Sequence, residues 1–177
     1  IKQGGCGKES PLPIREEGIN MANDMMYVTL SNGVKMPQLG YGVYQVTQAI
    51  LSKLQDGGYP TDAINCIIMS PTRELAQQID QAMQGFSYYL PDVSSVAVYG
   101  GNDGIRYEQE KRSMQSGADV IIATPGRLIS HISLGNVDLS KVSFFILDEA
   151  DRMLDMGFSE DIMQIAKMLP DGRQTIL

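Results

Sequence analysis

Phe144-Phe145-Ile146-Leu147-Asp148-Glu149-Ala150-Asp151 is an apolar run that ends abruptly in carboxylates. An apolar run of this kind is typical of a strand buried on both faces of a parallel sheet. An NTPase presents acids to a phosphate-bound metal from such a strand tip, although a solvated turn or a helix N-cap also favours Asp there. The stretch therefore predicts a buried strand, with either a Mg²⁺ site or an ordinary turn at its end.

Three further apolar runs have the same character, and helical stretches separate them. The four strand-like runs cover residues 63–69, 93–99, 118–123 and 142–147. Apolar side chains repeat at helical spacing between and after these runs: Leu75, Ile79, Met83 and Phe86; Leu128, Ile129 and Ile132; and Ile162, Ile165, Ala166 and Leu169. Strands that alternate with such helices predict an α/β fold, a three-layer parallel sheet with helices on both faces. Function is then expected at the carboxyl ends of the strands.

Two more of these strand ends carry residues suited to binding phosphate. Pro71-Thr72-Arg73 follows one strand-like run, and Thr124-Pro125-Gly126-Arg127 follows another. Each segment places a hydroxyl, backbone N–H groups and an Arg at the start of a helix, which is a suitable cradle for a nucleic-acid backbone. Turn chemistry also accounts for the glycines and prolines, and the two interpretations are compatible.

Length and composition limit what the chain can be. At 177 residues and 43% hydrophobic, it is long enough for one globular domain with a core. Its net charge of −7 argues against a dedicated nucleic-acid binder, so any RNA contact needs a local patch. Cys6 and Cys66 are too far apart in sequence to suggest a metal site, and Cys66 lies in an apolar run typical of a core. The sequence shows no signal peptide and no long apolar span. These features predict a cytoplasmic protein without a membrane segment. The single His131 lacks neighbouring ligands, so we expect it at the surface or at a helix end.

The first quarter of the chain lacks the regular alternation of strand-like and helical segments. Residues 1–24 are rich in Gly, Pro and charge, which predicts a disordered tail or linker. Residues 27–36 form two short strand-like runs around Ser31-Asn32-Gly33, a strong hairpin signal. The apolar run 39–46 predicts a strand, followed by a helix over 47–54 that Gly57-Gly58 ends. We expect residues 25–177 to form one α/β domain.

Together the strand-end motifs resemble those of a DEAD-box RNA helicase. They occur in the order PTRELA (71–76), Gly100-Gly101, TPGR (124–127) and DEAD (148–151), and residues 152–158 continue the likeness. The resemblance covers about residues 50–177. It implies part of the first RecA-like domain of a helicase, and hence an incomplete domain of the P-loop NTPase type.

The resemblance implies a role for each matching residue. Asp148 corresponds to the aspartate that coordinates Mg²⁺, Glu149 to the general base, and Asp151 to the residue that links this motif to the next one. ATP and Mg²⁺ are the cofactors of that family. An RNA sugar-phosphate track would be lined by Pro71, Thr72, Arg73, Gly100, Gly101, Thr124, Pro125, Gly126 and Arg127.

The sequence departs from the family at the phosphate-binding loop. A loop of the form G-x-x-x-x-G-K-[ST] is expected upstream of Pro71, and the printed sequence contains no match. The nearest string, residues 4–10, offers Gly7-Lys8 as the Gly-Lys of the loop. This alignment places Lys2, ahead of the string, where the first Gly belongs, and Glu9 where the metal-binding Ser or Thr belongs. We therefore expect that neither ATP nor Mg²⁺ is bound productively.

Two further family features are missing from the printed residues. The adenine-reading glutamine motif is not recognisable around Gln45 and Gln48. The sequence ends at Leu177, before the Ser-Ala-Thr motif and the second RecA-like domain of a helicase. On the family's mechanism this chain alone is not expected to unwind RNA.

In place of the phosphate-loop segment stands a stretch that resembles another family. Residues 28–46, with Leu39-Gly40-Tyr41-Gly42, are similar to the N-terminus of an aldo-keto reductase, where a hairpin closes the bottom of a (β/α)₈ barrel. No downstream reductase pattern follows. We interpret the chain as a chimera in which residues 25–49 contribute a hairpin and a replacement parallel strand to the helicase-like residues 50–177.

Three functions are compatible with this organisation. The first is a helicase fragment that binds RNA weakly and lacks ATPase and unwinding activity. The second is an engineered or recombined chimera without biological function, in which an open sheet edge allows homo-oligomers or segment swapping. The third, a nicotinamide oxidoreductase, rests on the short reductase-like segment alone.

Overall fold

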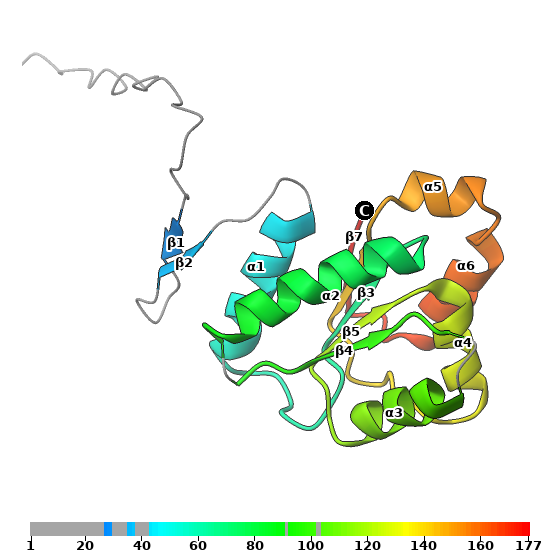
Figure 1. The fold of residues 1–177 in the computed structure, drawn as a ribbon, viewed down its shortest axis with the longest axis horizontal. Helices are drawn as coiled ribbons and strands as arrows, with labels where there is room; N and C mark the ends of the chain where they lie inside the picture. Colours follow the sequence, from blue (N-terminus) through cyan, green and yellow to red (C-terminus); the bar gives the residue numbers. More distant parts are fainter. Residues whose placement is uncertain (1–26, 30–34, 38–42, 91, 102–103) are drawn as a thin grey trace, which may run out of the picture.

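The computed structural model describes residues 27–29, 35–37, 43–90, 92–101 and 104–177. The alternation of strands and helices expected from the sequence is present in them (Figure 1). The elements are β1 (Tyr27–Thr29), β2 (Lys35–Pro37), α1 (Val43–Gln55), β3 (Cys66–Met69), α2 (Arg73–Ser87), β4 (Ser95–Val98), α3 (Gly104–Gln115), β5 (Val120–Ala123), α4 (Pro125–Ser133), β6 (Phe144–Leu147), α5 (Ala150–Asp155), α6 (Ser159–Met168) and β7 (Gln174–Ile176).

The main sheet is parallel and has five described strands in the order β4-β5-β3-β6-β7. Ile67 of β3 lies opposite Ile121 of β5 and Phe145 of β6, and every pairing in the sheet runs parallel. The predicted α/β class is therefore confirmed. All four predicted strand-like runs contain a strand, each somewhat shorter than the apolar run itself.

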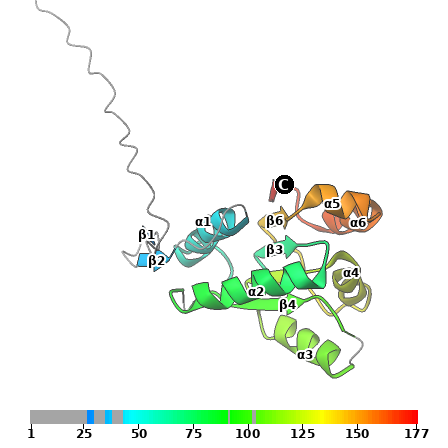
Figure 2. The same ribbon diagram turned by 45° about the horizontal axis from the view of Figure 1, so that its top comes forward.

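Alternate residues of the strands build two cores, one on each face of the sheet. Ile68 packs with residues of α1 and α2, such as Ile50 and Phe86. Ile67 packs on the opposite face with residues of α3, α4 and α6, such as Leu128 and Ile165. Figures 1 and 2 show these two helical layers with the strands between them. Because side chains alternate along a strand, the continuous apolar runs supply both cores at once.

Strand β4 departs from the expectation of burial on both faces. Ser95, Val96 and Ala97 are only half-buried, whereas every residue of β3, β5 and β6 is buried. The reason is topological, because β4 ends the strand order and has one neighbour, β5. Cys66 is a core residue as expected, and burial raises the pKa of its thiol.

The segment before β3 is partly as predicted. Strands β1 and β2 form an antiparallel pair, with Tyr27 opposite Pro37, which confirms the hairpin, although its turn lies outside the described residues. The strand expected over 39–46 is wrong for residues 43–46, which belong to α1. Val43, Val46 and Ile50 recur at helical spacing, and this period outweighs the β-branched composition. The described sheet therefore contains no replacement strand from these residues.

The described helices include one that apolar periodicity does not reveal. Helix α3 buries only Glu110 and Met114, so its polar sequence carries no apolar stripe. It does contain many residues of high helix propensity between Gly104 and Gly117. None of the described helices combines the length and apolar character that crossing a membrane requires.

Candidate nucleic-acid interface

The parallel sheet brings the ends of four strands together at one edge. The amide of Thr124 donates to the Val98 carbonyl (3.3 Å), and the amide of Asp148 donates to the Met69 carbonyl (2.9 Å). The ends of β4, β5, β3 and β6 therefore lie side by side in that order. We call the first three of these ends, residues 71–73, 100–101 and 124–126, the phosphate edge. The acids at the fourth end, Asp148, Glu149 and Asp151, are the acidic end.

The part of the phosphate edge that follows β3 is a capped helix start. Thr72 is the N-cap of α2, and its hydroxyl accepts a hydrogen bond from the Leu75 amide at 3.3 Å. The Ser70 hydroxyl donates to the Thr72 carbonyl at 3.3 Å, and Pro71 is buried. These contacts fix the turn, and the first helical residue, Arg73, is exposed to solvent. A fixed helix start with an exposed cation is suited to a phosphate group.

The neighbouring helix start, that of α4, is open. Thr124 is the N-cap, and its side chain makes no capping hydrogen bond. Pro125 is buried at the first turn, where its missing N–H costs nothing. Gly126 is exposed, and a Cβ added there would meet nothing within 4 Å. The first-turn amides of α4 can therefore be approached closely by an anion.

The Gly100-Gly101 turn requires glycine at its first position. Gly100 has a φ of +75°, and a Cβ built on it would lie 3.3 Å from Cδ of Arg127. A side chain at this position would meet both the left-handed backbone and the Arg127 stem. The turn after β4 and the start of α4 thus pack directly against each other.

Arg127 lies at this edge, but its guanidinium is directed inward. Its Nε donates to Oε2 of Glu110 at 2.8 Å, and its Cζ lies 4.5 Å from the centre of the Tyr107 ring. The side chain is 18% exposed, and Nη2 is buried without a hydrogen-bond partner. The contacts of Arg127 therefore tie the start of α4 to α3, and its place on an RNA track stays a prediction.

The surroundings of Arg127 also correct the interpretation of His131. This residue does lie in the last turn of α4, but it is fully buried instead of being at the surface. Its Nε2 lies 3.0 Å from Oε2 of Glu110, and its ring stacks on Tyr107 with centroids 4.2 Å apart. Asn136 donates to the Tyr107 hydroxyl at 2.9 Å and lies 3.4 Å from Nδ1 of His131. A proton on Nε2 satisfies both histidine contacts.

We call Glu110, Arg127, His131, Tyr107 and Asn136 the Glu110 cluster. Sequence reasoning identified Arg127 as a site residue and missed the other four. The clue was available in α3, where a carboxylate stands four residues before the buried Met114 and so on the same helix face. A buried charge needs a partner, and Arg127 is that partner.

The acidic end has a different geometry. Asp148 is half-buried, and this burial is the main cause that raises its pKa. The negative charge of the neighbouring Glu149 raises the pKa of Asp148 further, whereas a hydrogen bond from the Glu149 amide lowers it. Glu149 adopts a left-handed backbone (φ 51°), is exposed, and pairs with Arg152 at 2.9 Å. Asp151 is exposed on α5.

These acids do not by themselves make a metal site. Among the described residues no group of three His, Cys, Asp or Glu side chains is arranged to hold a metal ion. Mg²⁺ is commonly held by one or two carboxylates together with substrate phosphates. Asp148 meets only the first of these requirements, and the loop that would hold the phosphates has no match in the printed sequence. The residues present therefore do not fit productive Mg²⁺ binding.

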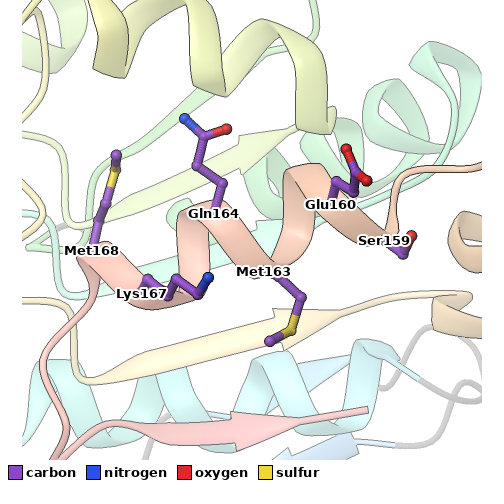
Figure 3. A pocket seen from close by; sticks show the side chains of 6 residues that line it. All are labelled: Ser159, Glu160, Met163, Gln164, Lys167 and Met168. Atoms are coloured by element: carbon purple, nitrogen blue, oxygen red, sulfur yellow. The ribbon is translucent and has the colours of Figure 1, made fainter.

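A separate hollow lies along α6, away from the strand ends. Figure 3 shows the six residues that line it, and its volume is about 490 Å³. Met163 and Met168 are 57% and 47% exposed. None of its lining residues belongs to the phosphate edge or the acidic end. Because it lacks charged groups directed at a common point, it is not the site of the chemistry. Its lining consists of Ser159, Glu160, Met163, Gln164, Lys167 and Met168.

Comparison with known proteins places this arrangement in a family. The family model of the DEAD/DEAH box helicases matches residues 44–177. The ATP-dependent RNA helicase DeaD of Escherichia coli (strain K12) is 40% identical over 174 residues, which are 97% of this chain and 26% of the relative. The ATP-dependent RNA helicase DBP3 of Lodderomyces elongisporus is 41% identical over 138 residues, which are 77% of this chain and 24% of the relative.

A solved structure supports the same assignment. The yeast DEAD-box splicing factor Prp28 matches with a TM-score of 0.64 and 29% identity, over 72% of this chain and 31% of that one. The chain thus spans about a quarter of the length of DeaD. Its fold is that of the first RecA-like domain. The chain belongs to the DEAD/DEAH box helicase family.

Proposed function

We propose that this chain binds the sugar-phosphate backbone of single-stranded RNA weakly, and that by itself it neither hydrolyses ATP nor unwinds RNA. The observation that carries the proposal is the phosphate edge, where two helix starts and a glycine turn lie side by side at the ends of β4, β5 and β3. Exposed amides and Arg73 supply donors without reading bases, so binding is independent of sequence.

Binding is tested by fluorescence anisotropy with a labelled oligo(U). We expect a dissociation constant of roughly 10–100 µM near physiological salt, within the range of sequence-independent binding. Arg73→Ala removes one phosphate contact and lowers the slope of log K against log salt by about 0.7. The matched control is Arg112→Ala, in the last turn of α3 and therefore near the opposite edge of the sheet. Equal weakening by the two variants, or no binding at millimolar protein, would refute the proposal.

The absence of ATPase activity follows from the electrostatics of the acidic end. Phosphoryl transfer depends on amides and a Lys that stabilise charge on the γ-phosphate, and loss of one such donor costs about 3 kcal/mol. The acids alone do not replace these donors. We expect no shift in thermal unfolding with millimolar Mg-ATP, whereas a ligand at a hundred times its Kd would add about 2.7 kcal/mol. RNA-stimulated hydrolysis that Glu149→Gln abolishes would contradict this part.

A second candidate is a recombined or engineered chimera without biological function. It is favoured by the start of the family match at residue 44, close to the end of the reductase-like stretch, and by the pairing of β1 with β2 in a sheet of their own. The match to DeaD over 97% of the chain argues the other way. On the chimera proposal residues 1–24 are a tail, and deleting residues 1–42 changes the free energy of unfolding by less than about 0.5 kcal/mol, the usual size of an effect without a named structural cause. A loss of several kcal/mol, measured in urea, would show that the segment belongs to the fold.

The edge of the main sheet is a second feature of the chimera proposal. Strand β7 pairs only with β6 among the described strands, and Gln174 and Thr175 are exposed. An open edge of this kind can pair with another chain. We expect a dimer whose population rises with concentration in light scattering, and which Thr175→Pro abolishes. A monomer at all concentrations would refute pairing through this edge.

A further inference from the structure

Glu110 joins three separate segments through one buried carboxylate. Its Oε1 accepts from the Gly100 amide at 3.3 Å, and its Oε2 accepts from Nε of Arg127 at 2.8 Å. Nε2 of His131 lies 3.0 Å from the same Oε2. Glu110 is only 4% exposed, and a buried carboxylate persists only when its charge and lone pairs are satisfied. The turn after β4 is therefore tied to α4 through α3.

The contacts of Arg127 already occupy most of its guanidinium in this arrangement. An Arg that grips phosphate presents its guanidinium fork outward. Here Nε is taken by Glu110, one face of the guanidinium lies on Tyr107, and Nη2 is buried. The stem of Arg127 also fills the space in which a Cβ of Gly100 would lie. Arg127 therefore supports the turn mechanically and neutralises Glu110.

We propose that Glu110 is the positioning residue of the phosphate edge, which holds the Gly100 turn against Arg127, and that Arg127 braces this turn instead of binding a phosphate. This inference rests on the proposed RNA binding, which it deepens by assigning the phosphate contacts to Arg73 and to the amides of Gly101 and Gly126. Because Glu110 and Arg127 neutralise each other, the pair contributes nothing to the release of counterions from RNA.

The first test needs no RNA. In NMR hydrogen exchange of the full chain, the Gly100 amide and the Arg127 Nε proton exchange slowly, and Glu110→Gln accelerates both at least about tenfold, because the charged acceptor is lost. The matched control is Asp119→Asn, a buried acid that accepts from Ser94 instead. This control leaves both protons unchanged. Fast exchange in the unmodified chain, or an equal effect of the two variants, would overturn the proposal.

The second test separates bracing from phosphate binding by the salt dependence of oligo(U) affinity. As a brace, Arg127→Met lowers the affinity several-fold and leaves the slope of log K against log salt unchanged. As a phosphate ligand, it lowers this slope by about 0.7, as Arg73→Ala does. That second result would overturn the proposal.

Arg127→Met leaves the Glu110 charge without its cation and can therefore unfold the protein. A double variant controls for this effect. Glu110→Gln with Arg127→Met removes both charges, and we expect it to bind RNA no more weakly than either single variant, because the two residues act through one turn. Additive losses would overturn the proposal. If the unmodified chain does not bind oligo(U), the proposed function fails, and the exchange experiment still decides whether Glu110 holds Gly100 and Arg127.

Discussion

The Glu110 cluster is tied to the strand ends through Gly100 and Arg127, and the acidic end lies at the same edge of the sheet, yet the two regions differ in the partners of their carboxylates. In the cluster, a buried carboxylate receives donors from Gly100, Arg127 and His131, all within the chain. At the acidic end, Asp148 is half-buried with a raised pKa, and Glu149 pairs with the exposed Arg152. The carboxylate of the first region is thus satisfied by donors within the protein, whereas the carboxylates of the second have no comparable set of donors among the described residues.

The two regions differ in whether the described residues complete their contacts among themselves. The contacts of the Glu110 cluster are complete because all its members, and Gly100, lie within residues 100–136. In the expectation drawn from the family resemblance, the acids act together with a phosphate-binding loop, and the sequence contains no match to such a loop. Three substitutions, each with a matched control, test whether the two regions differ in their contribution to stability.

The largest expected effect is the loss of Arg127. Arg127→Ala leaves Glu110 buried without its cation, so we expect the free energy of unfolding in urea to fall by about 3 kcal/mol. Arg152→Ala removes the same residue type from the exposed pair at the acidic end and should cost no more than about 0.5 kcal/mol. If Arg127→Ala and Arg152→Ala lowered the free energy of unfolding equally, the Glu110 cluster would be no more important for stability than the exposed pair at the acidic end.

A smaller effect is expected from Gly100. Gly100→Ala places a Cβ on a left-handed backbone and 3.3 Å from Arg127, so we expect a loss of about 1–2 kcal/mol. The control is Gly126→Ala, where no atom lies within 4 Å of the added Cβ and the residue is helical. This control should be neutral or slightly stabilising. Thermal or urea unfolding distinguishes them, and a neutral Gly100→Ala would show that the turn is not held in this conformation.

The smallest effect concerns the titration of Asp148. Its pKa is raised in the fold, so the charged form is disfavoured and stability is lost as pH rises through the folded pKa. Asp148→Asn should therefore raise stability at pH 7, by less than about 1 kcal/mol because the group is half-exposed. The gain should vanish below about pH 3.9, the ordinary aspartate pKa.

Asp138 is the matched control for this titration. Hydrogen bonds from Ser140, the backbone amide first, lower the pKa of Asp138. Its contribution to stability is therefore present above the ordinary aspartate pKa and is lost as pH falls through the folded value. Asp138→Asn should lower stability at pH 7, opposite in sign to Asp148→Asn. Unfolding measured from pH 3 to 7 gives both signs, and a loss from Asp148→Asn at pH 7 would contradict the raised pKa.

The parts of the fold that the sequence predicts are those with a strong local pattern. Runs such as residues 144–147 are apolar throughout and are followed by turn residues. This pattern predicts both that the run is a strand and that it lies in the interior of the sheet. The pattern is weaker in residues 43–46, where a β-branched composition suggested a strand and the helical period prevailed. In α3 almost no apolar residue marks the buried face, so apolar periodicity predicts neither this helix nor the burial of Glu110.

The chemistry of individual side chains was less accessible from the sequence. Arg127 follows a strand end in a phosphate-cradle pattern, and nothing local indicates that its guanidinium turns inward to Glu110. His131 has no ligand-like neighbours in sequence, yet it is buried against Tyr107 from another helix. Both outcomes depend on residues some 17 to 24 positions away, which no periodicity reports.

The amino-acid sequence by itself determined the α/β class, the alternation of strands with most of the helices, and which residue types stand at each strand end, because these follow from side-chain periodicity and turn chemistry within a few residues. The tertiary structure alone decided which strand ends are neighbours, that Glu110 is buried between Gly100 and Arg127, and that Asp148 remains without such a set of donors. Pairing and burial of charge depend on residues distant in sequence, and only packing brings these together.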